Sequence, residues 1–184
     1  MKNVKVGFIW MFSVFASSCS INGNFKGLHS YYNQTVRQKP DFFVNSDTID
    51  NLCDSDLSNR IIITNGIKVK ECLRYLPTSL IYMWSPNCSS GYCYSLAAIQ
   101  QKCKEKNIQL IVVAEYYDIS KMNLKYNLDK CIFSIDTKYY RTNLTAMYRE
   151  MFLYDLTGEN NPYLRFIQFE NGILSRTFEN VDSI

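Results

Sequence analysis

Two cysteines near the middle of the chain have a spacing that allows thiol–disulfide chemistry. Cys88 and Cys93 stand five residues apart in the segment Cys88-Ser-Ser-Gly-Tyr-Cys93. In such chemistry one thiolate attacks a disulfide to form a mixed disulfide, and a neighbouring thiol then resolves it. We therefore take Cys88 as the candidate nucleophile and Cys93 as the candidate resolving thiol. We expect Cys88 to be partly exposed and Cys93 to be more buried, one turn inside a helix.

Helix geometry restricts how these two cysteines can bond. On a regular α-helix, residues five apart are separated by about 7.5 Å along the axis and by about 140° around it. A disulfide needs Cα atoms roughly 4.4–6.8 Å apart. The pair can therefore bond only if Cys88 lies in the loop before the helix, or if the first turn unwinds. The two serines and the glycine between the cysteines are compatible with both arrangements.

The remaining cysteines have other expected roles. Cys53 and Cys72 could tie the N-terminal segment to the domain through a disulfide. Cys103, on the core face of a predicted helix, and Cys131, at the start of a predicted strand, are expected to be small buried hydrophobic residues.

The chain contains one histidine, His29, which excludes multi-histidine metal sites. We expect His29 to be a solvated side chain. The spacing of Cys88 and Cys93 differs from that of the usual zinc ligand pairs, and no second pair follows. We therefore expect neither a metal nor a cofactor.

Length and composition indicate a single folded domain. The chain has 184 residues, of which 47% are hydrophobic and 20% charged, so it can bury a core. Its formal net charge is +3, from 20 basic and 17 acidic residues spread along the chain. This small balance does not favour a nucleic-acid partner.

The N-terminus has the pattern of an export signal. Lys2 and Lys5 precede the uncharged segment 6–16, which is too short to cross a bilayer as a helix. The following Ala16-Ser-Ser-Cys19 resembles the lipobox of bacterial lipoproteins, although Ala16 replaces the usual large aliphatic residue. The resemblance implies that residues 1–18 are removed and that Cys19 is acylated, for example with palmitate. It further implies a lipid-anchored protein of the bacterial cell envelope that faces the periplasm or the exterior. An ordinary secretory signal is the alternative.

The mature chain divides into two parts. Residues 19–58 are predicted to be a tether, 20–37, followed by irregular structure, and residues 59–184 to be the folded domain. Asn65-Gly66 predicts a hairpin turn between strands at 61–64 and 67–69. Apolar runs and turn residues predict the remaining elements of the domain, which are strands at 79–84, 108–114 and 131–135, helices at 90–107, 119–129 and 143–156, and an antiparallel hairpin at 163–169 and 173–178.

This order resembles the thioredoxin-like family over about residues 60–180. An apolar strand ends in Trp84-Ser-Pro-Asn-Cys88, Pro162 precedes the terminal hairpin, and Phe169-Glu-Asn-Gly-Ile173 resembles the turn of that hairpin. The segment 131–136 is similar to the extra element of the membrane-anchored, cytochrome-maturation branch. The resemblance implies an α/β fold with a central mixed sheet, flanking helices and a terminal antiparallel hairpin.

The same resemblance implies a substrate groove beside the cysteines. Trp84, Pro86, Asn161 and Pro162 would line it, with Pro162 in the cis form and facing Cys88.

The expected Cys-x-x-Cys motif is absent, and so is the family's buried acid. Its place, six residues before Cys88, is taken by Tyr82. Glu115, at the end of the strand 108–114, is the candidate acid or base instead.

A second family has the five-residue spacing. Ser85-Pro-Asn-Cys88 is similar to the Thr-Pro-x-Cys setting of the bacterioferritin-comigratory type of peroxiredoxin. Peroxiredoxins place an arginine just before a late strand, where this chain has Asn161-Pro162. Arg165 is expected to lie inside the strand, which favours the thioredoxin-like alignment.

These observations leave three hypotheses for function. The first is a membrane-anchored thiol–disulfide oxidoreductase that acts on protein thiols or disulfides. The second is a non-catalytic binding module in which the Cys88–Cys93 bond is structural, because a fold alone does not establish activity. The third is a thiol peroxidase.

Overall fold

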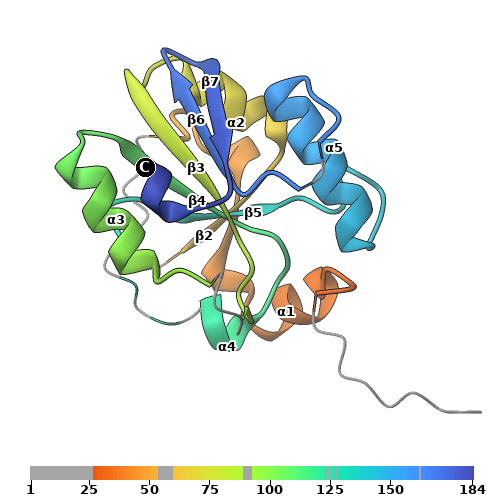
Figure 1. Cartoon of the computed structure of the whole chain (residues 1–184). Coiled ribbons are helices and arrows are strands. Elements are labelled where there is room, and N and C mark those ends of the chain that lie inside the picture. Colours follow the sequence, from red (N-terminus) through yellow and green to blue (C-terminus); the bar gives the residue numbers. More distant parts are fainter. Residues whose placement is uncertain are drawn as a thin grey trace, which may run out of the picture.

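The structure is a computed structural model that describes residues 27–53, 60–88, 93–122, 124, 126, 128–161 and 163–184. It is an α/β domain built on one seven-stranded sheet with the order β1-β2-β5-β4-β3-β6-β7 (Figure 1). The strands are β1 (Phe43–Asn45), β2 (Ile61–Thr64), β3 (Thr78–Trp84), β4 (Gln109–Ala114), β5 (Ile132–Ile135), β6 (Phe166–Glu170) and β7 (Ile173–Phe178).

The sheet is mixed, as the sequence predicts. The neighbouring strands in the series β1, β2, β5, β4 and β3 pair in parallel. Strand β3 pairs antiparallel with β6, and β6 pairs antiparallel with β7. Strand β3 lies between β4 and β6, and its residues from Ser79 to Trp84 are all buried. Its unbroken apolar run is typical of a strand that is covered on both faces.

Helices cover both faces of the sheet. Helices α2 and α5 pack against one face, and α1 and α3 against the other. No helix in the described part of the chain is long and apolar enough to cross a membrane. The helices are α1 (Tyr32–Gln38), α2 (Gly66–Leu73), α3 (Leu96–Glu105), α4 (Ile119–Met122) and α5 (Thr145–Thr157), with short 3-10 turns at Pro40–Phe42, Ser46–Thr48 and Val181–Ser183.

The terminal hairpin is confirmed, together with its two-residue turn. Glu170 pairs with Ile173, and the turn residues Asn171 and Gly172 have φ angles of 51° and 76°. Asparagine and glycine adopt this left-handed conformation at little cost, and such turns follow the twist of the two strands.

The prediction of a hairpin at Asn65-Gly66 is wrong. Asn65 instead caps α2, because its side-chain oxygen accepts a hydrogen bond from the Lys68 backbone N–H at 3.0 Å. Asparagine favours both turns and helix N-caps, so the dipeptide alone is ambiguous. Packing explains the glycine: a Cβ atom at Gly66 would lie 2.3 Å from the carbonyl oxygen of Phe152 in α5.

The N-terminal segment is more ordered than expected. Strand β1 extends the sheet beside β2, where irregular structure was predicted. From Gly27 onward the chain packs on the domain instead of forming a tether. His29 forms a β-bridge with Leu144, and Ser30, fully buried, donates its backbone N–H to the Asn143 carbonyl at 3.0 Å.

Three predicted elements are longer than the observed ones. Helix α3 begins at Leu96 instead of Ser90, α4 ends at Met122, and β6 begins at Phe166 instead of Tyr163. Helix α3 therefore starts eight residues after Cys88. The sequence predicts that this helix begins close to Cys88, but the N-terminus of α3 lies further along the chain.

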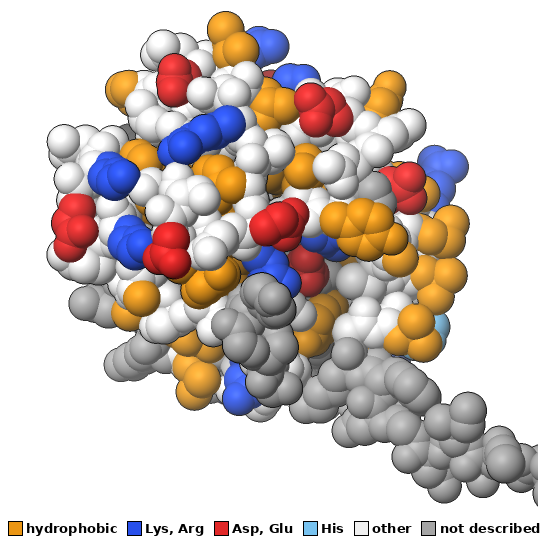
Figure 2. Space-filling model, in the orientation of Figure 1, with side chains coloured by type: hydrophobic (Ala, Val, Ile, Leu, Met, Phe, Trp, Pro, Cys, Tyr) orange, Lys and Arg blue, Asp and Glu red, His pale blue; other side chains and the backbone are white. Residues whose placement is uncertain are grey.

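The surface of the face in Figure 2 mixes acidic and basic side chains. Lys102 and Asp182 form an exposed ion pair at 3.0 Å, which links α3 to the C-terminal turn. Hydrophobic side chains gather toward one edge of this view, on the side where Figure 1 shows α5.

A buried tyrosine joins α2 to α5. The Gly66 N–H donates to the Tyr140 hydroxyl at 2.9 Å, and this hydroxyl donates to the Asp155 carboxylate at 2.9 Å. Burial raises the pKa of Tyr140 well above its usual value, so the hydroxyl keeps its proton. The neighbouring Tyr139, in contrast, is 47% exposed.

Replacement of Tyr140 by phenylalanine should destabilise the domain. Tyr140→Phe leaves the buried Gly66 N–H without its acceptor, which costs about 1–3 kcal/mol of unfolding free energy. The exposed Tyr139→Phe is the matched control and should change stability by less than about 0.5 kcal/mol. Urea unfolding followed by circular dichroism measures both variants. Equal stabilities would contradict the role of the Tyr140 hydroxyl.

Candidate functional site

The candidate site lies where the central strand leaves the sheet. After Trp84 the chain turns, and the Cys88 N–H donates to the Ser85 carbonyl at 3.1 Å. Cys88 and Cys93 form a disulfide with their Cα atoms 5.6 Å apart. Cys88 thus lies in the loop before the helix, which is one of the two arrangements that the spacing permits.

The expected position of Cys93 one turn inside a helix is wrong. Cys93 precedes α3 by three residues instead of lying one turn inside it, and both cysteines are half-buried.

Beside the disulfide is a cavity of about 550 Å³ that four aromatic side chains help to line. Trp84 is only 6% exposed and meets the Tyr126 ring edge-to-face, with the ring centroids 5.4 Å apart. Four of the candidate site residues predicted from the sequence line the cavity, namely Trp84, Pro86, Cys88 and Cys93. The other described residues around it are Tyr82, Ser85, Tyr94, Ser95, Leu96, Ala97, Lys121, Leu124 and Tyr126. Its lining combines aromatic and apolar side chains with two serines and Lys121.

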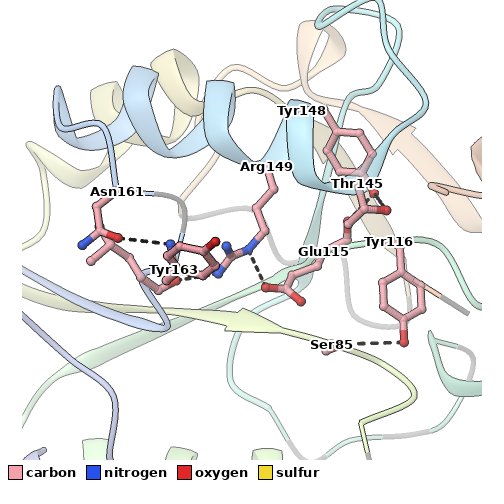
Figure 3. A network of polar contacts seen from close by, with 9 residues as sticks. Ser85, Glu115, Tyr116, Thr145, Tyr148, Arg149, Asn161 and Tyr163 are labelled. Carbon is pink, nitrogen blue, oxygen red and sulfur yellow. Dashed lines mark hydrogen bonds and ion pairs between the residues drawn. The ribbon is translucent and has the colours of Figure 1, made fainter. Parts of the chain in front are cut away.

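Residues that follow β4 hold the loop before Cys88. The Tyr116 hydroxyl accepts a hydrogen bond from the Ser85 hydroxyl at 3.5 Å (Figure 3). It also accepts one from the Asn87 N–H at 2.9 Å. The Asn87 side-chain amide donates to the Asp118 carboxylate. The loop is thereby fixed to the same edge of the sheet at which β4 ends.

Glu115 lies in a second polar group at this edge (Figure 3). Arg149 of α5 donates from Nε to the Glu115 carboxylate at 2.6 Å and from a second guanidinium nitrogen to the Leu164 carbonyl at 2.9 Å. The Glu115 side chain is only 17% exposed and the Arg149 side chain only 15%. Glu115 is thus an ion-paired carboxylate.

Leu164, two residues after Pro162 in the sequence, joins this second group through its carbonyl oxygen, which accepts the hydrogen bond from Arg149. Asn161 is exposed and its side chain accepts a hydrogen bond from the Tyr163 N–H at 3.1 Å. Among the described residues, Asn161 is not one of those that line the cavity. Pro162 itself, and with it the predicted cis bond, lies outside the described residues, as does Cys19.

Tyr82, at the place of the family's buried acid, lines the cavity. Burial raises the pKa of its hydroxyl. The nearby charge of Arg165 lowers this pKa and the charge of Glu115 raises it, and the net shift is upward. Tyr82 therefore stays protonated near neutral pH, so it can donate a hydrogen bond but cannot act as a base.

Arg165 does not lie inside the strand, which corrects the sequence prediction. It stands immediately before β6, and its carbonyl oxygen accepts the Met83 N–H at 2.9 Å. This is the place at which the peroxiredoxin pattern expects an arginine.

Three of the other described cysteines match their expected roles, whereas Cys131 is less buried than expected. Cys53 and Cys72 form a disulfide with a Cα–Cα distance of 5.5 Å, and they are 6% and 5% exposed. Cys103 is fully buried and Cys131 is half-buried against the core. Within the described ranges, no three His, Cys, Asp or Glu side chains are grouped so that they could hold a metal ion.

Sequence reasoning missed the residues that hold the loop and Glu115. Tyr116 and Asp118 directly follow the predicted strand 108–114, and that position was the available signal. The carboxyl ends of parallel neighbouring strands meet at one edge of a sheet, which brings them near Cys88. Arg149 has no such signal, because it comes from a distant helix.

Comparison of the chain with models of known protein families, with curated proteins and with solved structures gives no match. The interpretation of the site therefore depends on its geometry and on the residue pattern.

Burial should protect Cys103 from alkylation while the protein is folded. Burial raises the pKa of its thiol to about 11. Since the thiolate is the reactive form, iodoacetamide at pH 8 should leave Cys103 unmodified even after the disulfides are reduced. Modification should increase as the pH approaches about 11. Peptide mass spectrometry measures it, with the urea-unfolded protein as the control. Rapid labelling of Cys103 at pH 8 in the folded protein would contradict this burial.

Proposed function

We propose that this protein is a lipid-anchored, thioredoxin-like thiol–disulfide oxidoreductase that acts outside the cytosol. The observation that carries the proposal is the Cys88–Cys93 disulfide, which is half-buried at the end of the central strand and borders a cavity of about 550 Å³. A substrate thiol or disulfide can approach a bond in this position.

The fold supports the thioredoxin-like part of the proposal. Strand β3 lies between β4, which pairs with it in parallel, and the β6–β7 hairpin, which pairs with it antiparallel through β6. The Trp84-to-Cys88 segment follows β3 directly. This is the arrangement that the resemblance in sequence implies. The resemblance also supports Pro162 as a groove residue beside Cys88.

The proposed reaction transfers two electrons. In the reduced protein, the Cys88 thiolate attacks one sulfur of a substrate disulfide, so that a Cys88–substrate disulfide forms and one substrate thiolate leaves. The Cys93 thiolate then attacks Cys88 Sγ, which releases the second substrate thiolate and forms the Cys88–Cys93 disulfide. The substrate is reduced and the protein oxidised. An external dithiol restores the reduced protein, and the reverse sequence oxidises a substrate dithiol.

The described surroundings of the cysteines supply hydrogen-bond donors but no unpaired base. Tyr82 keeps its proton because burial raises its pKa, and Glu115 is paired with Arg149. Protons for the leaving thiolates therefore come from water, whereas the Tyr82 hydroxyl, which lines the same cavity, can donate a hydrogen bond to a thiolate.

A thiol peroxidase is the second candidate, and the position of Arg165 before β6 favours it. In that reaction the Cys88 thiolate attacks a peroxide oxygen, giving a sulfenic acid and water or an alcohol. Cys93 then condenses with the sulfenic acid, which releases water and forms the disulfide. Consumption of hydrogen peroxide with a dithiol as the reductant distinguishes this candidate from the first.

Single cysteine variants test the oxidoreductase. Cys88→Ser should abolish the dithiol-driven reduction of a model protein disulfide. Cys93→Ser should accumulate a mixed disulfide through Cys88, because the attacking thiol remains while the resolving thiol is absent. Turnover assays and non-reducing mass spectrometry measure the two effects.

The matched control is Cys103→Ser, which changes a buried cysteine outside the cavity and should keep full turnover. A structural disulfide would behave differently: neither variant would trap a partner, and the bond would resist reduction at potentials near about −300 mV. That result would favour the binding-module hypothesis.

The anchor is tested separately. Cys19→Ser should prevent acylation and release the protein from the membrane fraction, whereas the neighbouring Ser20→Ala should remain anchored. Incorporation of labelled palmitate and membrane fractionation measure this. A Cys19→Ser protein that still carries palmitate and stays in the membrane would exclude the lipobox interpretation.

A further inference from the structure

Helix α5 exposes a stripe of large apolar side chains. Met147, Met151 and Tyr154 recur at intervals of four and three residues, so they lie on one face of the helix. They are 46%, 38% and 53% exposed. The opposite face of α5, with Tyr148 and Phe152, is fully buried in the core.

Neighbouring residues extend this stripe into a patch. Tyr139, at 47% exposure, borders the same surface cavity of about 530 Å³ as the three residues of the stripe. Leu144 and Leu28, at 41% and 55%, continue it at the N-terminal end of α5. Together these are six of the eleven exposed large hydrophobic side chains in the described part of the chain. We call them the α5 patch.

The described chain begins at the end of this patch. The Thr145 N–H donates to the Leu28 carbonyl at 3.1 Å, and His29 pairs with Leu144. Gly27, the first described residue, is therefore fixed beside the N-terminus of α5. Figure 1 shows α1 and the lower end of α5 in this region.

The distance from the proposed anchor to Gly27 is short. Gly27 comes eight residues after Cys19, and a fully extended chain of that length reaches at most about 28 Å. A folded domain of about 155 residues is roughly 40 Å wide. An anchor at Cys19 thus holds the domain with the Gly27 region toward the bilayer.

We infer that the α5 patch rests on the lipid bilayer, in the headgroup region, when Cys19 is anchored. This inference depends on the lipid anchor of the proposed function, and not on its redox chemistry. Tyrosine is enriched at membrane interfaces, where its apolar ring and polar hydroxyl are both accommodated. Tyr139 and Tyr154 flank the apolar Met147 and Met151 in this way. The exposed Glu150 and the exposed Lys138 and Arg141 nearby suit a hydrated headgroup layer better than the acyl interior.

The α5 patch and the cavity beside the disulfide belong to different layers of the domain. The sheet separates the core layer that contains α5 from the layer that contains α3 and Trp84. The cavity at Cys88 and Cys93 is lined from the second layer, by residues such as Tyr94 and Leu96. None of the six residues of the α5 patch is therefore among the described residues that line the cavity.

Photolabelling in vesicles tests the inference. The full protein is purified from membranes and reconstituted in phosphatidylethanolamine–phosphatidylglycerol vesicles that contain a phospholipid with a diazirine near its headgroup. After illumination, labelled peptides should contain residues of the α5 patch. Tyr75 and Ile173, which are 82% and 73% exposed outside the patch, should not be labelled.

A charged variant and its control complete the experiment. Met147→Glu combined with Met151→Glu should reduce labelling of α5 by about tenfold, because each carboxylate opposes entry into the interface. Ile173→Glu, at an exposed position outside the patch, should leave the labelling unchanged. Since the replaced side chains are exposed, thermal unfolding should confirm that both variants fold.

Several outcomes would overturn the inference. One is acylated Cys19 without labelling of α5, and another is equal labelling of Tyr75 and Ile173. A dimer that the charged variant dissociates, without lipid labelling, would assign the patch to a second copy of the chain. Unmodified Cys19 would remove the anchor on which the inference rests. Reduction of a model disulfide in the same vesicles reports on the redox proposal independently.

Discussion

Hydrogen bonding on both sides of β3 fixes the point from which the site is built. Pairing continues to the very end of the strand: the Glu115 N–H donates to the Trp84 carbonyl at 2.8 Å, and the Met83 N–H donates to the Arg165 carbonyl at 2.9 Å. Because both flanks are held, the chain leaves the sheet at a defined position and direction. Four residues later it reaches Cys88. The sheet, and not the helix that follows, positions the disulfide.

Side chains from other elements then restrain the loop that follows β3. Tyr116, just after β4, holds the backbone of Asn87, so the loop before Cys88 is tied to a second strand. Arg149 binds both Glu115 and the chain before β6, which aligns α5 with the same edge. An ion pair that is largely removed from water contributes more to this alignment than to net stability, because its desolvation opposes its Coulomb attraction.

The sequence predicts the elements whose signals are local. Apolar runs at 79–84 and 108–114 identify central strands, and Asn171-Gly172 identifies a turn, since few other residues adopt its backbone angles. Asn65-Gly66 misleads because the choice between turn and helix cap depends on the distant Phe152. Strand β1 has only three residues, too few for a periodic signal. For the site, the spacing of Cys88 and Cys93 indicates that they can pair. The contact of Arg149 with Glu115 joins residues 34 positions apart, so no local pattern predicts it.

The two disulfides differ in how easily solvent reaches them. Cys53 and Cys72 are nearly inaccessible and close a loop of 19 residues, so their bond restricts the unfolded chain and ties the segment before β2 to α2. An external thiolate can attack only a sulfur that it can reach, which for this pair requires local unfolding. Cys88 and Cys93 are half-buried and border a cavity, so attack requires no such opening. Exchange with a substrate should therefore select the second pair even where both bonds have similar reduction potentials.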